Sequence, residues 1–392
     1  MSTFKKLFQQ TFIYGLATVL PRMLNVLLIP LYTHVLPKAE YGEVSIIFAY
    51  FVFFNVILAY GMETAFFRFY NKMKNKKEVL STSGWSLVST SLVFFAVAFL
   101  AQDFIAEMVN IPVKYIQLVI WILFLDALVI IPFTWLRAAE KPMRFAVIKI
   151  INVCINLGLN IFFLLFLEDL ALENSVFQSI YVPNFEISYI FISNLVASGV
   201  TLLMMLPFYF KIDFRFNNKL WKAMMSYAFP VLIAGLAFSI NEVFDRIMLD
   251  YLLPQDIARD EIGAYAACYK LALFMTLFAT AFRLGIEPFF FSHAEAKNAQ
   301  ETYAIITKYF VVFGSFILVA VIVFIDILKE LLIQNSTYWE AMHIVPLILL
   351  ANLFLGIYHN LSVWYKITDR TRFGGYISVV GALFTLALNI IL

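Results

Sequence analysis

The sequence predicts an all-α polytopic membrane protein made of two parallel repeats, each a six-helix bundle, with the second bundle incomplete. Hydrophobic residues make up 62% of the 392 residues and charged residues only 14%, far from the composition of soluble domains. Eleven stretches approach or exceed the roughly 20 apolar residues that a helix needs to cross a bilayer. A segment near the N-terminus recurs in the second half of the chain. These three observations together predict two related halves in a membrane.

The eleven predicted spans follow one another with short connections. The first is too long for a signal peptide, lacks a small-residue cleavage site and belongs to the repeat, so we expect it to be a helix of the mature protein. The predicted spans cover residues 10–36, 42–67, 81–102, 114–136, 145–167, 187–210, 222–252, 262–291, 303–328, 338–365 and 373–392.

The distribution of Lys and Arg predicts the orientation of the chain. With the N-terminus inside, 20 of the 28 basic residues fall on the inner side, and Arg137 and Lys149 are counted among them in one connection. The other side receives four, which are Lys38, Lys114, Arg259 and Lys329. Because basic residues are retained in cytoplasmic loops, the sequence predicts a cytoplasmic N-terminus.

The repeat defines the predicted domains. Its anchors pair Gly15-Leu16-Ala17 with Gly235-Leu236-Ala237, Leu36-Pro37 with Leu253-Pro254, Gly42 with Gly263, and Gly61 and Glu63 with Gly285 and Glu287. A second echo pairs Arg144-Phe145 with Arg372-Phe373, six helices further on. An even number of helices between copies makes the repeat parallel. We expect a six-helix bundle over 1–210, a cytoplasmic linker over 211–222, and a five-helix bundle over 223–392 that lacks its sixth helix and is therefore truncated.

Motifs for soluble chemistry are absent from the sequence. It contains no GxxxxGK[ST] phosphate loop, no HExxH and no paired Cys motif. Cys154 and Cys268 lie in apolar runs and are expected to be packing residues. We therefore expect no enzyme activity, no cofactor, no metal site and no nucleic-acid partner.

Three short motifs give a family resemblance. The chain resembles the polysaccharide flippases of the multidrug/oligosaccharidyl-lipid/polysaccharide exporter superfamily at LPKAEYGEVSI from Leu36, GMETAFFRF from Gly61 and the KPMRF turn from Lys141. The resemblance implies a V-shaped, two-lobed transporter in the bacterial inner membrane. It implies that the substrate is a polyprenyl-diphosphate-linked oligosaccharide, moved from the inner to the outer leaflet for surface polysaccharide and lipopolysaccharide (O-antigen) synthesis, with polysaccharide assembly enzymes as candidate partners.

Basic residues within the spans are the first candidates for a substrate site, because a charge at mid-membrane costs about 3 kcal/mol on insertion scales. Arg22 lies about twelve residues, or roughly 18 Å, from the inner end of the first span. It could face a wet cavity and pair bidentately with a phosphate, or it could bind a neighbouring helix through Asp126.

Three more basic residues could complete a cationic cavity. Arg246 has Glu242 and Asp250 four residues away on the same helix face, so a structural ion ladder is an equal alternative. Arg283 has Glu287 at the same spacing. Lys270 has no acid at such a spacing and needs a partner from elsewhere or from the substrate.

Membrane carboxylates are candidates for gating or ion coupling. Glu63 and Glu287 occupy equivalent places in the repeat, toward the inner ends of the second and eighth spans. They could couple transport to protons or sodium, or they could hold a cytoplasmic gate closed against Arg68 and its neighbours. Asp126 could be a proton site or the partner of Arg22.

Three functions remain open from the sequence. The first is the lipid-linked oligosaccharide flippase, working by alternating access. The second is a multidrug exporter that exchanges cationic drugs for ions, with an acidic cavity built around Asp126, Glu63 and Glu287. The third is a non-transporting membrane scaffold for polysaccharide assembly.

Overall fold

The computed structural model describes residues 19–20, 23–24, 26–292, 298–368, 370 and 372–391. Within this part all regular secondary structure is helical, and ten helical segments are long and apolar enough to cross a membrane. They coincide with the last ten of the eleven predicted spans, so the prediction of an all-α polytopic membrane fold is confirmed. Of the first predicted span, residues 10–18, 21–22 and 25 lie outside the described residues, and α2 (Leu28–Val35) forms its last part.

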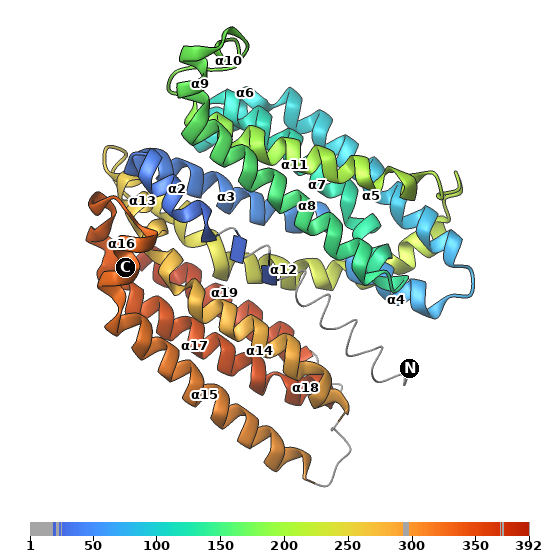
Figure 1. Ribbon diagram of the computed structural model, residues 1–392. Helices are drawn as coiled ribbons and strands as arrows, with labels where there is room; N and C mark the ends of the chain where they lie inside the picture. The colour runs from blue at the N-terminus through green and yellow to red at the C-terminus, as the bar shows by residue number, and fades with distance from the viewer. Residues whose placement is uncertain are drawn as a thin grey trace. The chain divides into compact units, whose positions relative to one another are not determined.

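Two compact units divide the chain (Figure 1). The first unit joins Met1–Ser45 to Leu249–Gly381, and the second joins Ile46–Met248 to Ala382–Leu392. Each unit is therefore assembled from segments that are far apart in the sequence. The predicted bundles over 1–210 and 223–392 remain a prediction.

The second unit contains most helices of the N-terminal half. Here α7 packs against α4, α5, α8 and α11, and these helices run side by side (Figure 1). The helices that lie wholly or largely in this unit are α3 (Lys38–Ala59), α4 (Met62–Lys72), α5 (Lys76–Leu100), α6 (Gln102–Val109), α7 (Val113–Ala138), α8 (Pro142–Ile161), the π-helix η1 (Phe162–Phe166), α9 (Leu167–Glu173), α10 (Ser175–Gln178), α11 (Glu186–Tyr209) and α12 (Asn218–Leu252).

The first unit brings α2 together with helices of the C-terminal half. In it, α14 and α15 pack against α17, and α13 packs against η3. Its helices are α2 (Leu28–Val35), α13 (Ala258–Tyr269), the 3-10 helix η2 (Lys270–Ala272), α14 (Leu273–Ser292), α15 (Ala299–Val323), α16 (Ile325–Leu332), the 3-10 helix η3 (Ser336–Ile344), α17 (Val345–Leu361) and α18 (Val363–Ile367), together with the first part of α19 (Arg372–Ile391).

A break at Tyr60 and Gly61 separates α3 from α4. Both residues have positive φ, 34° and 73°, a region that glycine enters without penalty. A Cβ on Gly61 would lie 3.0 Å from the carbonyl carbon of Ala228 and closer still to its oxygen. Met62 and Ala228 are fully buried and belong to a buried hydrophobic cluster at this point. The glycine therefore lets the bent chain approach α12 closely.

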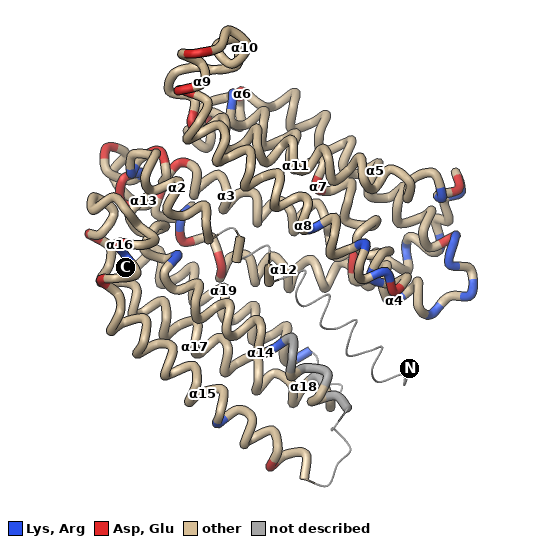
Figure 2. The backbone as a smooth tube through the Cα atoms, viewed as in Figure 1, with Lys and Arg blue, Asp and Glu red and all other residues tan. Residues whose placement is uncertain are grey.

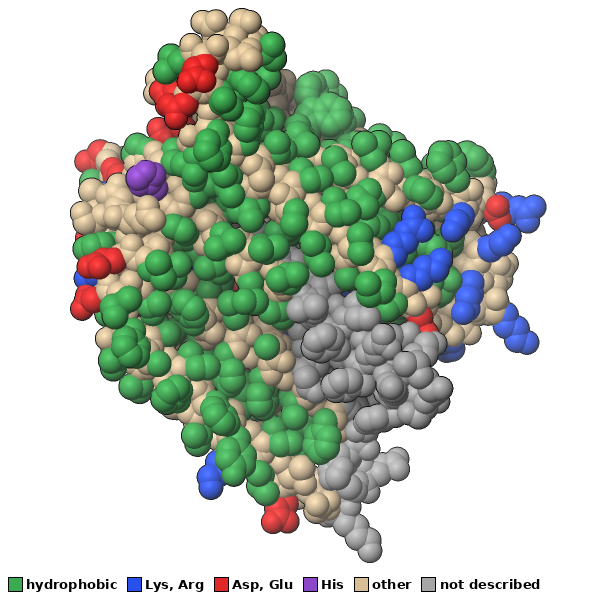
Figure 3. Space-filling model, in the orientation of Figure 1, with side chains coloured by type: hydrophobic (Ala, Val, Ile, Leu, Met, Phe, Trp, Pro, Cys, Tyr) green, Lys and Arg blue, Asp and Glu red, His purple; other side chains and the backbone are tan. Residues whose placement is uncertain are grey.

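Charge is segregated along the second unit. Lys and Arg gather around the end of α4, and acidic residues gather around α9 and α10 (Figure 2). Hydrophobic side chains cover much of the helical surface between these two ends (Figure 3). This pattern is the one that basic cytoplasmic loops and an apolar lipid-facing band produce.

Candidate functional site

A cavity of about 350 Å³ lies among α4, α7, α8 and α11, entirely within the second unit. Its lining includes four charged side chains, two acids and two bases: Glu63, Asp126, Arg137 and Lys149. Charged side chains within membrane spans are costly and mark functional sites by default. This cavity is therefore the strongest candidate site in the described part of the chain.

Two of the charges form an ion pair across helices. Arg137 Nη1 donates to Glu63 Oε1 at 2.6 Å, and both side chains are about half exposed, at 46% and 47%. The ion-pair partner of Glu63 is therefore Arg137, and a role of Glu63 in gating or ion coupling remains a prediction. The Arg68 guanidinium lies instead over the ring of Tyr227, 4.2 Å from its centroid.

The other two charges do not touch. Asp126 accepts a hydrogen bond from Ser198 Oγ at 2.7 Å. The Lys149 ammonium lies over the Phe133 ring, 4.3 Å from its centroid, and interacts electrostatically with Asp126 and Glu63. Among the described residues it has no hydrogen bond or ion pair. The prediction that Lys149 belongs to a cytoplasmic connection was wrong, because α8 begins at Pro142 and carries Lys149 two turns into the helix.

Uncharged polar groups complete the lining of this cavity. Asn152 Nδ2 donates to Thr201 Oγ1 at 2.9 Å, and Thr201 Oγ1 donates to the carbonyl of Ala197 at 2.8 Å. Thr134 Oγ1 donates a hydrogen bond to the carbonyl of Ile130 in the same helix. The amide of Asn194 has no hydrogen-bond partner within the described residues.

Helical spacing explains why these side chains converge. Residues four and seven apart lie on one face of a helix. On α8 this spacing aligns Phe145, Lys149 and Asn152, and on α11 it aligns Asn194, Ser198 and Thr201. On α7 the same face carries Asp126, Ile130, Phe133 and Arg137. Sequence reasoning singled out Glu63 and Asp126 but missed the other polar residues of this site, although the common spacing of polar residues in α7, α8 and α11 was the available signal.

A second polar centre lies in the first unit, where α3 and α13 cross at Gly42 and Gly263. A Cβ on Gly42 would lie 2.9 Å from the carbonyl carbon of Arg259, and one on Gly263 would lie 2.8 Å from that of Lys38. Both carbonyl oxygens would be closer still. The two glycines were paired by the sequence repeat, and at both of them the backbones of the two repeats come into close contact. We call this contact the repeat crossing.

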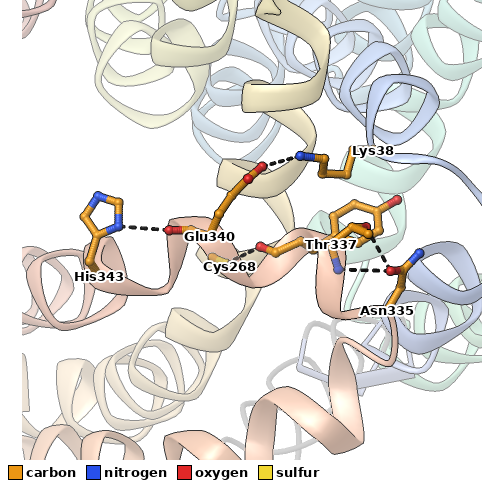
Figure 4. A network of polar contacts seen from close by, with 7 residues as sticks. Lys38, Cys268, Asn335, Thr337, Glu340 and His343 are labelled. Carbon is orange, nitrogen blue, oxygen red and sulfur yellow. Dashed lines mark hydrogen bonds and ion pairs between the residues drawn. The ribbon is translucent and has the colours of Figure 1, made fainter.

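Ion pairs and hydrogen bonds flank the repeat crossing. Arg259 Nη1 donates to Glu43 Oε2 at 2.9 Å, and Lys38 pairs with Glu340 of η3 (Figure 4). Tyr338 is fully buried and donates its hydroxyl to the carbonyl of Leu36 at 2.7 Å. The sequence analysis placed Lys38 and Arg259 in outer connections. In the structure both residues form ion pairs between the two halves of the chain.

Cys268 and Asn335 add further hydrogen bonds to η3 next to the repeat crossing. The Cys268 thiol is fully buried and donates to the carbonyl of Tyr338 at 3.3 Å (Figure 4). The side chain of Asn335 accepts from the backbone N–H of Thr337 at 3.0 Å and so caps the start of η3. The prediction that Cys268 is a packing residue agrees with this position.

The remaining predicted site residues are dispersed. Arg22 lies outside the described residues, as does the side chain of Glu287. Arg246 is 7% exposed and forms an ion pair with the adjacent Asp245, Nη1 to Oδ1 at 3.4 Å. Lys270 is half-buried in η2 and interacts within the protein. Arg283 lines a small cavity in the first unit with His359 and Asn360.

The sequence matches the family described as "Polysaccharide biosynthesis protein" over residues 7–282. This match covers more than half of the chain. The chain belongs to this family. No match was found among curated protein sequences.

Solved structures of several membrane transporters have a fold similar to that of this polysaccharide biosynthesis protein. It is similar to a lipid II flippase, MurJ, in an inward closed conformation, with a TM-score of 0.74, 17% identity, and coverage of 97% of this chain and 81% of that one. It is also similar to an inward-facing multidrug resistance MATE family transporter of the MOP superfamily, with a TM-score of 0.62, 12% identity, and coverage of 97% and 94%. A mutant of the Vibrio cholerae MATE transporter VcmN gives a TM-score of 0.63, 16% identity, and coverage of 98% and 87%.

These structural neighbours are membrane transporters and a lipid flippase, and they share the fold of this chain. The two-lobed fold class predicted from the sequence is thereby confirmed. Among the described residues no group of three or more His, Cys, Asp and Glu side chains is placed to hold a metal ion. The polysaccharide biosynthesis protein is therefore a multi-pass membrane protein whose candidate site is made of charged, amide and hydroxyl groups.

Proposed function

We propose that the protein is a flippase that moves a polyprenyl-diphosphate-linked oligosaccharide from the inner to the outer leaflet of the bacterial inner membrane. The product would supply surface polysaccharide or lipopolysaccharide synthesis of the O-antigen type. The observation that carries the proposal is the match to a polysaccharide biosynthesis family by a chain with the fold of a lipid II flippase. The N-terminus is cytoplasmic, and the protein catalyses no covalent step and needs no cofactor.

Basic side chains at membrane depth recognise the diphosphate in this proposal. Arg22 is the principal one, because a guanidinium binds phosphate oxygens bidentately. Arg283 supports it, since it lines a cavity and has no ion pair within the described residues. Arg246 contributes less because Asp245 already neutralises it. Lys270 is a weaker candidate because it already interacts within the protein.

Membrane voltage supplies the driving force. A diphosphate diester carries about two negative charges, and each charge moved outward across an inside-negative membrane gains about 2.3 kcal/mol per 100 mV. The flippase then needs no obligatory ion exchange. Glu63, Glu287 and Asp126 act in gating in this version rather than as coupling sites.

The test is a flipping assay in proteoliposomes that contain a fluorescent polyprenyl-diphosphate oligosaccharide. Transfer to the outer leaflet should rise with an imposed inside-negative potential. Arg22→Ala should abolish both this transfer and surface polysaccharide in cells. Arg215→Ala, in the exposed linker, should leave both unchanged. Transfer that ignores the potential would contradict the voltage-driven version, and wild-type protein that moves no such lipid would contradict the function.

The similarity to MATE family transporters favours a second candidate, the export of cationic drugs in exchange for protons or sodium. An exporter should raise resistance to a cationic dye such as ethidium and should lose that activity in Asp126→Asn. The two candidates separate on Arg22→Ala, since only the flippase loses surface polysaccharide.

A further inference from the structure

We infer that the cavity among α4, α7, α8 and α11 binds the sugar end of the transported lipid, separately from the diphosphate. This inference rests on the proposed flippase function. It assigns a saccharide site within the second unit alone, lined by groups suited to hydroxyl recognition.

The charge balance of the cavity argues against a simple ion site. Glu63 and Arg137 are paired at 2.6 Å, and Asp126 faces a lining that also contains Lys149. Two acids and two bases leave no net charge, so neither a free anion nor a free cation is favoured electrostatically. A neutral ligand with many donors and acceptors can use all four groups, since carboxylates accept and basic side chains donate.

The uncharged lining fits the same kind of ligand. Asn152, Asn194, Ser198 and Thr201 carry amides and hydroxyls that can donate and accept, as the hydroxyl groups of a sugar do. Asn194 and Lys149 have no hydrogen bond among the described residues, so their donors are available to a ligand. A polar group without a partner inside a membrane protein is costly, and a bound ligand or water would relieve that cost.

Aromatic rings provide the apolar surface that such a site needs. Phe133 and Phe145 line the cavity and contact each other edge to face, with centroids 5.4 Å apart. The apolar face of a pyranose ring can pack against these rings while its hydroxyls reach α8 and α11. A volume of about 350 Å³ is within the range of small-ligand pockets, roughly 300–1,000 Å³.

The experiment measures binding of the free oligosaccharide to purified full-length protein in nanodiscs. The probe is the water-soluble saccharide released by mild acid from the lipid-linked substrate that the flipping assay uses, and calorimetry reports its dissociation constant. Asn194→Leu and Lys149→Met should each weaken binding about tenfold, which corresponds to 1.4 kcal/mol. Asn156→Leu changes another amide of α8 that lies outside the cavity lining, and it should bind like the wild type. Thermal unfolding of each variant checks that the fold is intact.

Failure of this inference differs from failure of the proposed function. Wild-type protein that flips the lipid, with cavity variants that bind the saccharide at wild-type affinity, would overturn the saccharide site alone. So would sodium- or proton-dependent flipping that disappears in Asp126→Asn while saccharide affinity stays unchanged, because the cavity would then be a coupling site. Wild-type protein that neither flips the lipid nor binds its saccharide would overturn both.

Discussion

Adding one methyl group at the repeat crossing should open it. In Gly42→Ala the new Cβ would lie 2.9 Å from the carbonyl carbon of Arg259, whereas ordinary contact begins at 3.4 Å. The two backbones must therefore separate by more than about 0.5 Å, and neither is a flexible side chain that could turn aside. Overpacking of this kind costs about 1–3 kcal/mol. Taking about 2 kcal/mol, the closed crossing loses roughly 30-fold in population against an open one.

Cys268 provides a native reporter for this opening. Its thiol is fully buried and bonded beneath the crossing, whereas Cys154 is exposed. In a Cys154→Ser background, a membrane-impermeant maleimide should label Cys268 slowly in the wild type and roughly 30-fold faster in Gly42→Ala.

Gly158→Ala is the matched control, because a Cβ there meets nothing within 4 Å. It should leave the labelling rate unchanged, and it should not lower the unfolding temperature, since Ala favours a helix over Gly. Gly263→Ala should repeat the effect of Gly42→Ala, and the double variant should be less than additive because both changes act on one contact. Labelling of Gly42→Ala at the rate of the Gly158→Ala control would refute a close backbone contact.

Two further predictions concern charge. Lys38→Glu should speed Cys268 labelling by a few-fold, since a partly exposed ion pair contributes up to about 1 kcal/mol. Adding Glu340→Lys should restore the wild-type labelling rate. A double variant that is labelled as fast as Lys38→Glu would show that this ion pair does not stabilise the closed crossing. Arg246→Met should lower the unfolding temperature, because it removes the largely buried ion pair with Asp245, and breaking such a pair costs about 3–5 kcal/mol. Loss of flipping with unchanged stability would instead make Arg246 a substrate ligand.

The spans were predictable because a bilayer imposes a simple rule of length and hydrophobicity. The sequence also revealed which residues of the two repeats correspond, and the structure explains why several of these corresponding residues are glycines. Gly42, Gly61, Gly235 and Gly263 are all positions where a Cβ would lie closer than 3.0 Å to an atom of another helix. Helices in a membrane associate through such close packing at small residues.

The candidate site was harder to predict. Glu63 and Asp126 were singled out as membrane carboxylates, but Lys149 was assigned to a connection because a count of basic residues by loop ignores where α8 begins. The partner of Glu63 could not be read from the sequence either. Arg137 is 74 residues away, and only the packing of α4 against α7 brings the two side chains together.

The two polar centres differ in their relation to the repeat. The glycines of the repeat crossing occur in both copies, as a symmetric contact requires. In the cavity Glu63 recurs as Glu287, but the polar residues of α8 do not: the offset that pairs Arg144-Phe145 with Arg372-Phe373 carries Lys149 onto Ile377 and Asn152 onto Val380. A residue needed to move the two repeats against each other should exist in both, whereas a residue that recognises an asymmetric ligand needs only one. Under the proposed flippase function, this distribution is the one expected if the shared glycines serve movement between the repeats and the cavity of the second unit serves ligand recognition.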